Sequence, residues 1–268
     1  MIDIHSHLLY EMDDGPATID DSIKMAQQSL MDGVTDIIVT PHYIKGSYDN
    51  TFERVTLRLN QLRTAFKELD MELNLYPGAE IYLDIDIVEE IKNKTIPTLN
   101  NGCYVLIELP AASVPHGTED IIFKLLIAKY IPIIAHPERN SELIRKPHKL
   151  YNLIEKGALT QMNAGSLLGD FGSQVARASK LFLQHKFIHF VGSDSHYHQG
   201  RCSKLTKWVE EASSYIGVDA ATEMVTNIPR KIIDSAEIEF PEPVMLEEID
   251  ERKQSNLLKN VLGKIFGT

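Results

Sequence analysis

The sequence predicts an α/β fold built from parallel βαβ units, and three observations support this prediction. Apolar runs rich in β-branched residues recur along the chain, and helical patterns separate them. The chain has 268 residues, of which 43% are hydrophobic, which suits one barrel domain of ~250 residues. No internal repeat or linker interrupts residues 1–216. Seven strands favour a (β/α) barrel, incomplete or distorted, and a doubly wound open sheet is the alternative.

Each strand is expected where an apolar run stands between helical patterns or turn residues. The first run begins at residue 2, so strand structure is expected from the start of the sequence. The seven strands are expected at Ile2–His5, Val34–Thr40, Leu73–Glu80, Cys103–Leu109, Ile131–Ala135, Leu159–Asn163 and Phe187–Val191.

Helical patterns lie between these runs, and the first pattern has recognisable ends. Thr18 and Asp21 stand at the start of Ile19–Met31 with a spacing that resembles a capping box, and Gly33 follows its last turn. Further helices are expected at Thr51–Leu69, Glu119–Tyr130, Leu150–Lys156, Gly172–His185 and Ser203–Tyr215.

The C-terminal part of the chain departs from this alternation. Val218–Ile233 is expected to be one helix interrupted near Pro229, and Glu237–Pro243 forms an acidic break. We therefore expect a barrel domain over residues 1–235 and a helical extension over residues 236–268. One apolar face of the extension is expected to pack on its own domain or on a sister subunit, with membrane attachment as the alternative. This face consists of Leu257, Val261, Leu262, Ile265 and Phe266.

Composition argues against several classes of protein. The net charge of -11 disfavours a nucleic-acid groove as the working surface. No stretch approaches the ~18 apolar residues of a membrane span, and the first residues do not resemble a signal peptide. The two cysteines, Cys103 and Cys202, offer no disulfide framework and suit a reducing compartment. We expect a cytoplasmic protein.

Polar side chains gather at the carboxyl ends of the expected strands, where parallel α/β folds place their active sites. His5 and His7 are one residue apart, so alternation turns both imidazoles to the same face of the strand. Nitrogen and oxygen ligands without cysteine suit Mn²⁺, Fe²⁺ or Zn²⁺ in a catalytic site. A surface acid or a turn histidine is the alternative for any one residue, but the whole set indicates a multinuclear metal site. The set is His5, His7, Asp14, His42, Glu80, Glu108, His136, Asp194 and His196.

Together with their neighbours, these residues resemble a known family. Met1–His7, the Asp-Asp-Gly-Pro segment at residues 13–16 and the Ala-His-Pro-Glu-Arg-Asn segment at residues 135–140 are similar to a bacterial tyrosine-protein phosphatase branch. This branch belongs to the polymerase and histidinol phosphatase (PHP) superfamily. The resemblance runs from residue 1 to about residue 235. Further matching motifs are Thr40-Pro41-His42, Gly78-Ala79-Glu80, Glu108 and Ser193-Asp194-Ser195-His196.

The resemblance implies a distorted (β/α)7 TIM-like barrel that holds three divalent metal ions, usually Mn²⁺. It also implies hydrolysis of phosphotyrosine on a cognate autokinase that regulates capsular or exopolysaccharide synthesis, by attack of a metal-bound hydroxide. Glu80 would bridge the first two metals. The ligands would be His5, His7, Glu80 and Asp194 for the first metal, Glu80, Glu108 and His136 for the second, and Asp14, His42 and His196 for the third.

Two arginines complete the expected site. Arg139 follows His136 by three residues, and Arg201 lies in the loop after the last strand. Because a guanidinium binds phosphate oxygens through parallel hydrogen bonds, we interpret both as catalytic residues; a solvated loop arginine stays open for Arg201. Cysteine-dependent tyrosine phosphatases carry an Arg six positions after the Cys. Leu109 and Trp208 occupy those positions here, so that chemistry is excluded.

Three other functions compete with this interpretation. A small-molecule phosphatase of the histidinol-phosphatase type would share the fold and the metals. A PHP-type nuclease is disfavoured by the acidic net charge. A metal-binding protein without activity is disfavoured because all nine ligand types are present.

Overall fold

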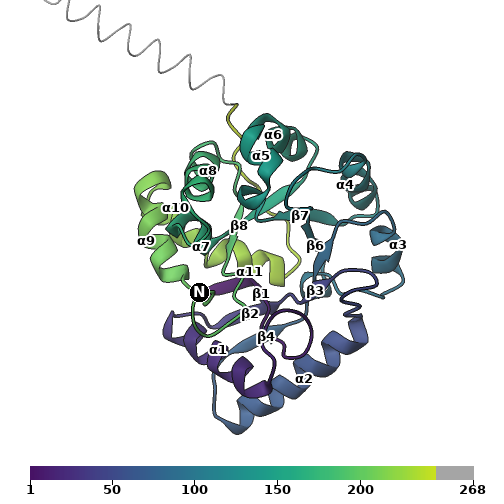
Figure 1. Ribbon diagram of the computed structural model, residues 1–268, viewed down its shortest axis with the longest axis vertical. Coiled ribbons are helices and arrows are strands. Elements are labelled where there is room, and N and C mark those ends of the chain that lie inside the picture. Colours follow the sequence, from purple (N-terminus) through teal and green to yellow (C-terminus); the bar gives the residue numbers. More distant parts are fainter. Residues whose placement is uncertain (246–268) are drawn as a thin grey trace, which may run out of the picture.

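The computed structural model describes residues 1–245 and shows a parallel α/β barrel with helices around it (Figure 1). A three-stranded sheet has the order β1-β2-β4, and a six-stranded sheet has the order β3-β5-β6-β7-β8-β9. All neighbouring strands in both sheets are parallel. The strands are β1 Ile2–Ser6, β2 Asp36–Val39, β3 His42–Tyr43, β4 Asn74–Tyr76, β5 Glu80–Tyr82, β6 Tyr104–Glu108, β7 Ile131–Ala135, β8 Leu159–Asn163 and β9 Phe190–Gly192.

The two sheets together complete the barrel. β2 pairs with β4, and β3 pairs with β5. β2 and β3 therefore act as one interrupted strand, and β4 and β5 act as a second one. The last strand meets the first through two backbone hydrogen bonds. Asp194 N donates to His5 O at 2.8 Å, and His7 N donates to Ser195 O at 2.9 Å. Seven strand positions therefore form a distorted ring, which confirms the predicted fold and excludes the open sheet.

Helices surround the strands, and most begin and end close to the predicted positions. Thr18 accepts a hydrogen bond from the backbone N–H of Asp21, so the predicted cap of α1 is confirmed. Three short helices, α3, α5 and α7, were not predicted. The helices are α1 Ile19–Met31, α2 Phe52–Glu68, α3 Ile87–Lys92, α4 Thr118–Ile127, α5 Ser141–Arg145, α6 Pro147–Glu155, α7 Ala164–Leu168, α8 Ser173–Gln184, α9 Leu205–Ile216, α10 Val218–Glu223 and α11 Asn227–Ile233, with 3₁₀ turns η1 Leu99–Asn101 and η2 Pro137–Arg139.

The third predicted strand, Leu73–Glu80, is wrong as a single strand, because it divides into β4 and β5. Pro77 in the break has no N–H to donate to a neighbouring strand. Gly78 follows and lies so close to β2 that a Cβ there would be 2.9 Å from Ile38 Cγ2. The break therefore lets the chain change sheets before Glu80.

Two predictions near the C-terminus also needed correction. The last strand begins at Phe190 and not at Phe187. The predicted helix Val218–Ile233 is two helices, and the break lies before Asn227. Pro229 itself lies in the first turn of α11, where a missing N–H costs no helical hydrogen bond.

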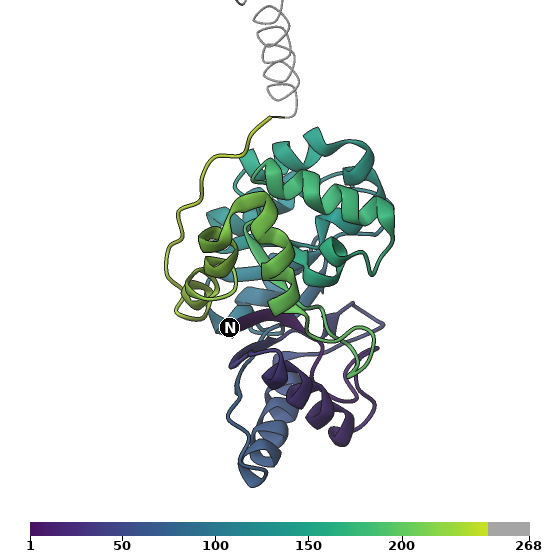
Figure 2. The ribbon, with the colours of Figure 1, turned by 90° about the vertical axis from the view of Figure 1, so that its left-hand side faces the viewer.

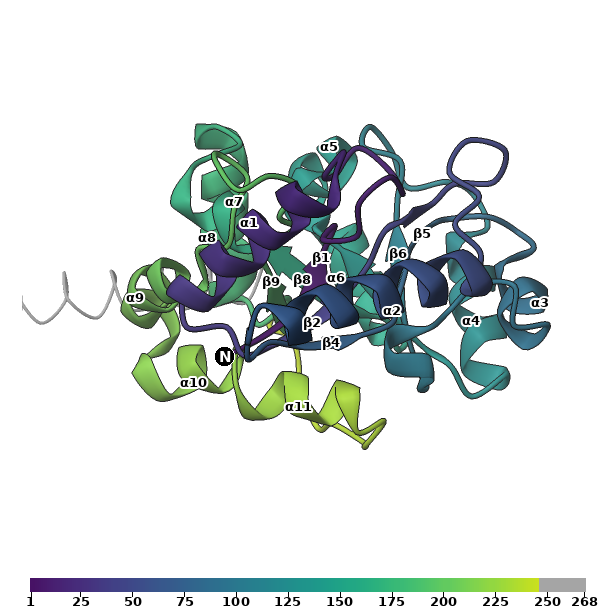
Figure 3. The same ribbon diagram turned by 90° about the horizontal axis from the view of Figure 1, so that it is seen from below.

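α11 closes the amino-terminal end of the barrel, which is the end opposite the predicted site. Ile232 belongs to the same buried apolar cluster as Ile4 of β1 and Leu106 of β6. Ile2 N donates to Val225 O at 2.8 Å, which fastens β1 to the segment before α11. Figure 3 shows α10 and α11 lying along this end of the strands.

After α11 the chain runs along the outside of the barrel (Figure 2). We call this segment, residues 234–245, the strap. Val244 N donates to His185 O at 2.9 Å, so the strap reaches the end of α8. The domain division at residue 235 stays a prediction, and the predicted apolar face at residues 257–266 lies outside the described residues. Within residues 1–245, no helix combines the length and the apolar character that a membrane crossing needs.

Candidate metal centre

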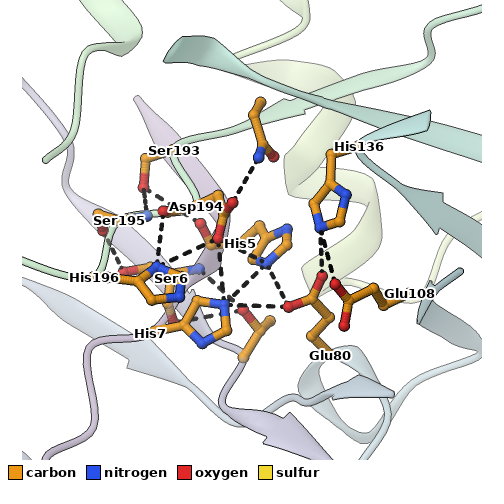
Figure 4. A network of polar contacts seen from close by, with 12 residues as sticks. His5, Ser6, His7, Glu80, Glu108, His136, Ser193, Asp194, Ser195 and His196 are labelled. Carbon is orange, nitrogen blue, oxygen red and sulfur yellow. Dashed lines mark hydrogen bonds and ion pairs between the residues drawn. The ribbon is translucent and has the colours of Figure 1, made fainter. Parts of the chain in front are cut away.

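The nine predicted ligands lie together at the carboxyl-terminal end of the barrel, and Figure 4 shows how seven of them face one another. His42 and Glu80 are partners in the register between β3 and β5, so the two strand interruptions bring these side chains together. The sources are β1 for His5 and the residue just after it for His7, β3 for His42, β5 for Glu80, β6 for Glu108, the segments after β7 and β9 for His136, Asp194 and His196, and the loop before α1 for Asp14.

The four predicted ligands of the first metal converge on one point. His5 Nε2 and His7 Nε2 are 3.2 Å apart. Each of these nitrogens also lies 3.2 Å from Glu80 Oε2. Asp194 Oδ1 is 3.5 Å from His5 Nε2 and 3.4 Å from His7 Nε2. At most 2% of any of the four residues is exposed, so these donor atoms face one another without solvent.

Glu80 also reaches the predicted ligands of the second metal. His136 Nε2 lies 2.8 Å from Glu80 Oε1 and 3.9 Å from Glu108 Oε1. His42 Nδ1 approaches the same pair of acids, at 3.1 Å from Glu80 Oε2 and 3.6 Å from Glu108 Oε2. One carboxylate thus lies between two sets of donors, which is the position that a bridging ligand requires.

The third predicted set surrounds Asp14. Its Oδ1 atom lies 3.2 Å from His196 Nε2 and 3.6 Å from His42 Nε2. His7 joins these three residues in a group whose donor atoms all lie within 4.8 Å of one another. His7 and His42 are each within reach of two sets, so the division of the ligands among three metals stays a prediction.

Hydrogen bonds on the far side of three histidines fix which ring nitrogen faces the centre. His5 Nδ1 donates to Gln161 Oε1 at 2.8 Å, and His7 Nδ1 donates to Asp13 Oδ2 at 2.7 Å. His196 Nδ1 donates to the backbone oxygen of Asp194 at 3.0 Å. Each Nδ1 hydrogen bond therefore turns Nε2 toward the centre, and Nε2 is the nitrogen that would bind a metal.

Two of these supporting residues, Gln161 and Asp13, were not predicted. Gln161 orients its oxygen toward His5 because its amide nitrogen donates to Met162 O and Asn163 Oδ1. Gln161 stands between Thr160 and Met162 in β8, and no pattern in the sequence marked it as a partner of His5. Asp13 stands next to a predicted ligand, and no pattern separated its role from that of its neighbour.

Unpartnered atoms provide a test of whether the residues fit a metal. Glu80 Oε2, His42 Nδ1 and His196 Nε2 are buried and make no hydrogen bond within the described structure. Leaving buried polar atoms without partners costs about 1–3 kcal/mol each. Divalent cations bound at these donor sets would satisfy the three atoms, together with the facing nitrogens of His5 and His7. The donor set therefore fits metal ions.

The acids of the centre have shifted pKa values. Burial by itself would raise the pKa of Glu80 and Asp194, but the nearby histidines, His5 foremost, hold both pKa values well below their usual range. Burial, followed by the charge of Glu80, raises the pKa of Glu108. Glu80 and Asp194 are therefore ionised at neutral pH, as metal ligands need to be.

The backbone is strained at two ligands and closely packed beside a third. His136 has a φ of 31° and Asp194 a φ of 50°, in the left-handed region that side chains with a Cβ seldom adopt. Such conformations cost about 1–3 kcal/mol and gather at functional sites. At Gly192 a Cβ would stand 2.6 Å from His5 Cβ, so only glycine lets β9 approach β1 here.

Both predicted arginines lie at this site and contact Asp194. Its Oδ2 atom accepts hydrogen bonds from Arg139 Nη1 at 2.9 Å and from Arg201 Nη2 at 2.7 Å. Asn163 Nδ2 donates to the same oxygen at 2.6 Å. The arginine side chains are 31% and 30% exposed, so a ligand in solvent can reach them. Whether either arginine binds phosphate stays a prediction.

Comparisons with known proteins agree with this geometry. Residues 1–234 match the family model for capsular polysaccharide synthesis, CpsB/CapC. The tyrosine-protein phosphatase YwqE of Bacillus subtilis is 41% identical over 196 residues, which are 73% of this chain and 77% of YwqE. The tyrosine-protein phosphatase CpsB of Streptococcus pneumoniae is 31% identical over 238 residues, which are 87% of this chain and 98% of CpsB.

A solved structure extends the likeness to three dimensions. It comes from crystal structures of YwqE from Bacillus subtilis and CpsB from Streptococcus pneumoniae, which are described as metal-dependent tyrosine phosphatases. Its TM-score is 0.88 at 35% identity, and the match covers 92% of this chain and 99% of that chain. The chain therefore belongs to the CpsB/CapC family of capsular polysaccharide synthesis.

Proposed function

We propose that this protein is a metal-dependent protein-tyrosine phosphatase. Its substrate would be phosphotyrosine on a cognate kinase of capsular or exopolysaccharide synthesis. The observation that carries the proposal is a buried set of nitrogen and oxygen donors beside two accessible arginines. Membership of a family whose relatives are named tyrosine-protein phosphatases supports it.

The nine donors would hold three divalent ions, for which Mn²⁺ is the proposed metal and Fe²⁺ or Zn²⁺ the alternatives. When bound, these ions would supply an activated water molecule and offset negative charge on the phosphoryl group. Gln161 and Asp13 would keep His5 and His7 in the tautomer that presents Nε2 to the centre. Glu80, ionised and facing two sets of donors, would join them.

Arg139 and Arg201 would bind the phosphoryl oxygens. Each guanidinium has five N–H donors, and one of them donates to Asp194 in this structure. N–H groups on the exposed side of each guanidinium remain for a substrate. Their positive charges would stabilise the negative charge that develops as the tyrosine phenolate leaves.

A substrate panel tests the proposal. Protein stripped of metal and reloaded with Mn²⁺ is assayed on a phosphotyrosine peptide, on histidinol phosphate and on single-stranded DNA and RNA. We expect the highest kcat/KM on the peptide. Preference for histidinol phosphate would indicate a small-molecule phosphatase, and cleavage of nucleic acid would indicate a nuclease.

Chelation separates metal chemistry from thiol chemistry in the same assay. Turnover of the peptide should disappear after exhaustive chelation and return with Mn²⁺, because the proposed nucleophile needs a metal. The matched control is the double variant Cys103→Ser and Cys202→Ser, which should keep its activity. Full activity in the chelated protein would contradict the proposed mechanism.

A further inference from the structure

Phe171, which no part of the proposed mechanism uses, lies against both arginines of the site. The Cζ atom of Arg139 lies 4.5 Å from the centroid of the Phe171 ring, and that of Arg201 lies 5.9 Å from it. Both distances are within the range of a cation–π contact. One half-buried aromatic ring therefore touches two guanidinium groups that come from different loops.

The two guanidinium groups need such a support because they converge on a single negative charge. Both donate to the same oxygen of Asp194, so two positive charges lie close together with one carboxylate between them. The other oxygen of Asp194 faces His5 and His7 and is assigned to the metals. The electron-rich face of Phe171 supplies additional attraction for both cations without competing for a hydrogen bond.

The loop that carries Phe171 has a defined conformation. It connects α7 to α8, and Gly169 and Gly172 on either side of the ring have φ values of 91° and 90°. Gly172 N donates to Gly169 O at 3.0 Å, and Asp170 N donates to Gly165 O at 2.9 Å. These two hydrogen bonds close the loop into tight turns.

The same loop is tied to the segment that holds Arg201. Asp170 forms an ion pair with Lys204, three residues after Arg201. At Gly165 a Cβ would stand 2.7 Å from Asp170 Oδ2, so glycine there lets the Asp170 side chain lie in this place. The contact between Phe171 and Arg201 is thus supported by a neighbouring contact between the two loops.

We propose that Phe171 is a positioning residue, which holds Arg139 and Arg201 in the orientation that binds the phosphoryl group of the substrate. The proposal rests on the proposed phosphatase function, because it assigns the arginines to phosphate. Phe171 acts through the arginines and has no role in holding metal. This role requires the aromatic ring of Phe171, and an apolar side chain of similar volume would not position the arginines.

The test compares Phe171→Leu, which keeps an apolar side chain, with Phe171→Trp, which keeps an aromatic face. Mn²⁺-loaded protein is titrated with inorganic phosphate by calorimetry, and kcat and KM are measured on p-nitrophenyl phosphate. Loss of two cation–π contacts should weaken phosphate binding and kcat/KM about tenfold in Phe171→Leu, with recovery in Phe171→Trp. Metal content and circular dichroism should stay unchanged. The matched control is Phe123→Leu on the exposed face of α4.

A double-mutant cycle shows whether the effect passes through the arginines. In an Arg139→Ala and Arg201→Ala background, Phe171→Leu should have no further effect on phosphate affinity. Equal phosphate affinity of wild type and Phe171→Leu, or equal losses in Phe171→Leu and Phe171→Trp, would overturn the positioning role. Wild-type protein that binds phosphate but hydrolyses no phosphate ester would instead refute the proposed function, while the binding data would still decide the role of Phe171.

Discussion

At the scale of single residues, Gln161 shows how a side chain outside the metal-binding set controls one inside it. It accepts a hydrogen bond from His5 Nδ1, and its own amide nitrogen donates to Met162 O and Asn163 Oδ1. Without this acceptor the imidazole would be free to rotate or to carry its proton on Nε2. The affinity for metal then depends on a residue that never touches the metal.

We therefore expect Gln161→Leu to bind Mn²⁺ about 10–100-fold more weakly than wild type, as is typical when an outer-shell partner of a ligand is lost. Calorimetric titration of metal-free protein gives the comparison. Gln161→Glu, which keeps an oxygen acceptor, is the control and should recover much of the affinity. Wild-type affinity in Gln161→Leu would show that the tautomer of His5 is fixed elsewhere.

Arg139 allows phosphate recognition to be separated from metal binding. Its guanidinium has no lone pair for a metal, so Arg139→Ala should keep its metal content. It should lose about 10²–10³ in kcat/KM on a phosphotyrosine peptide, by analogy with removal of one oxyanion donor. Arg139→Lys should recover only part, because it lacks the planar fork. Unchanged kinetics in the alanine variant would show that Arg139 is a surface residue without a role in phosphate recognition.

Most of the ligand residues could be recognised from the sequence because they stand at or near the ends of the predicted strands, and parallel strands bring their carboxyl ends to one rim. The residues that orient them could not be recognised in the same way. Gln161 acts from within β8 and Phe171 from a loop after α7. Their roles depend on distances between segments remote in the sequence, and no local pattern reports those distances.

At the scale of elements, the interruptions within two strands are the main difference from the predicted pattern. An apolar run indicates burial, and it does not tell which sheet a strand joins. Ile131–Ala135, Leu159–Asn163 and Ile19–Met31 were predicted with the observed bounds because their ends carry clear turn or cap residues. Around Pro77 and Gly78 the run stays apolar while the chain changes partners, so one strand was predicted where two exist.

His189, the residue before β9, is buried beside the strap after α11, and its titration affects the stability of the fold. Burial lowers the pKa of His189 to about 3, and its Nδ1 atom accepts a hydrogen bond from Thr160 N at 3.1 Å. The Phe240 ring of the strap packs edge-on against it, with centroids 4.6 Å apart. The unfolded chain takes up a proton near pH 6.5, whereas the folded protein does not until about pH 3.

The free energy of unfolding should therefore fall as the pH drops from 6.5 toward 3, by up to about 1.4 kcal/mol per pH unit from this group. Above pH 6.5 the contribution of His189 is fully present. His189→Gln keeps an acceptor for Thr160 and removes the titration, so its acid limb should be shallower. Urea unfolding at several pH values between 4 and 7 measures both slopes. Parallel slopes would show that His189 does not remain neutral in the folded protein.

At the scale of the whole molecule, the barrel places its charged centre at one end and its apolar closure at the other. The resemblance to the tyrosine-phosphatase branch and the distorted barrel were both predicted, and both are confirmed. The closure of the ring between β1 and β9 could not be derived from pattern alone, because periodicity does not distinguish a ring from an open sheet. The family resemblance supplied that information.

Metal should also stabilise the whole fold, since five buried or half-buried histidines and four acids face one another at the rim. A ligand at 100 times its Kd adds about 2.7 kcal/mol if it binds only the folded protein. The Tm should then rise by roughly 5–10 °C when Mn²⁺ is added to metal-free protein. Differential scanning calorimetry measures the shift, with His136→Ala as the control that should respond less. An unchanged Tm would mean that the folded protein has no greater affinity for metal than the unfolded chain, which would contradict the predicted site.

The contact between the ends of β1 and β9 also determines at which stage of synthesis the metal centre can form. Ser6 and Ser195 touch through their hydroxyl oxygens at 2.8 Å although 189 positions separate them, and His5 and Asp194 lie beside them. On the ribosome, the first histidines emerge long before their partners have been translated. Until then a nascent chain has separate ligands and no centre. The protein is therefore without a working site throughout most of its own synthesis, and a polypeptide released before β9 would lack one permanently.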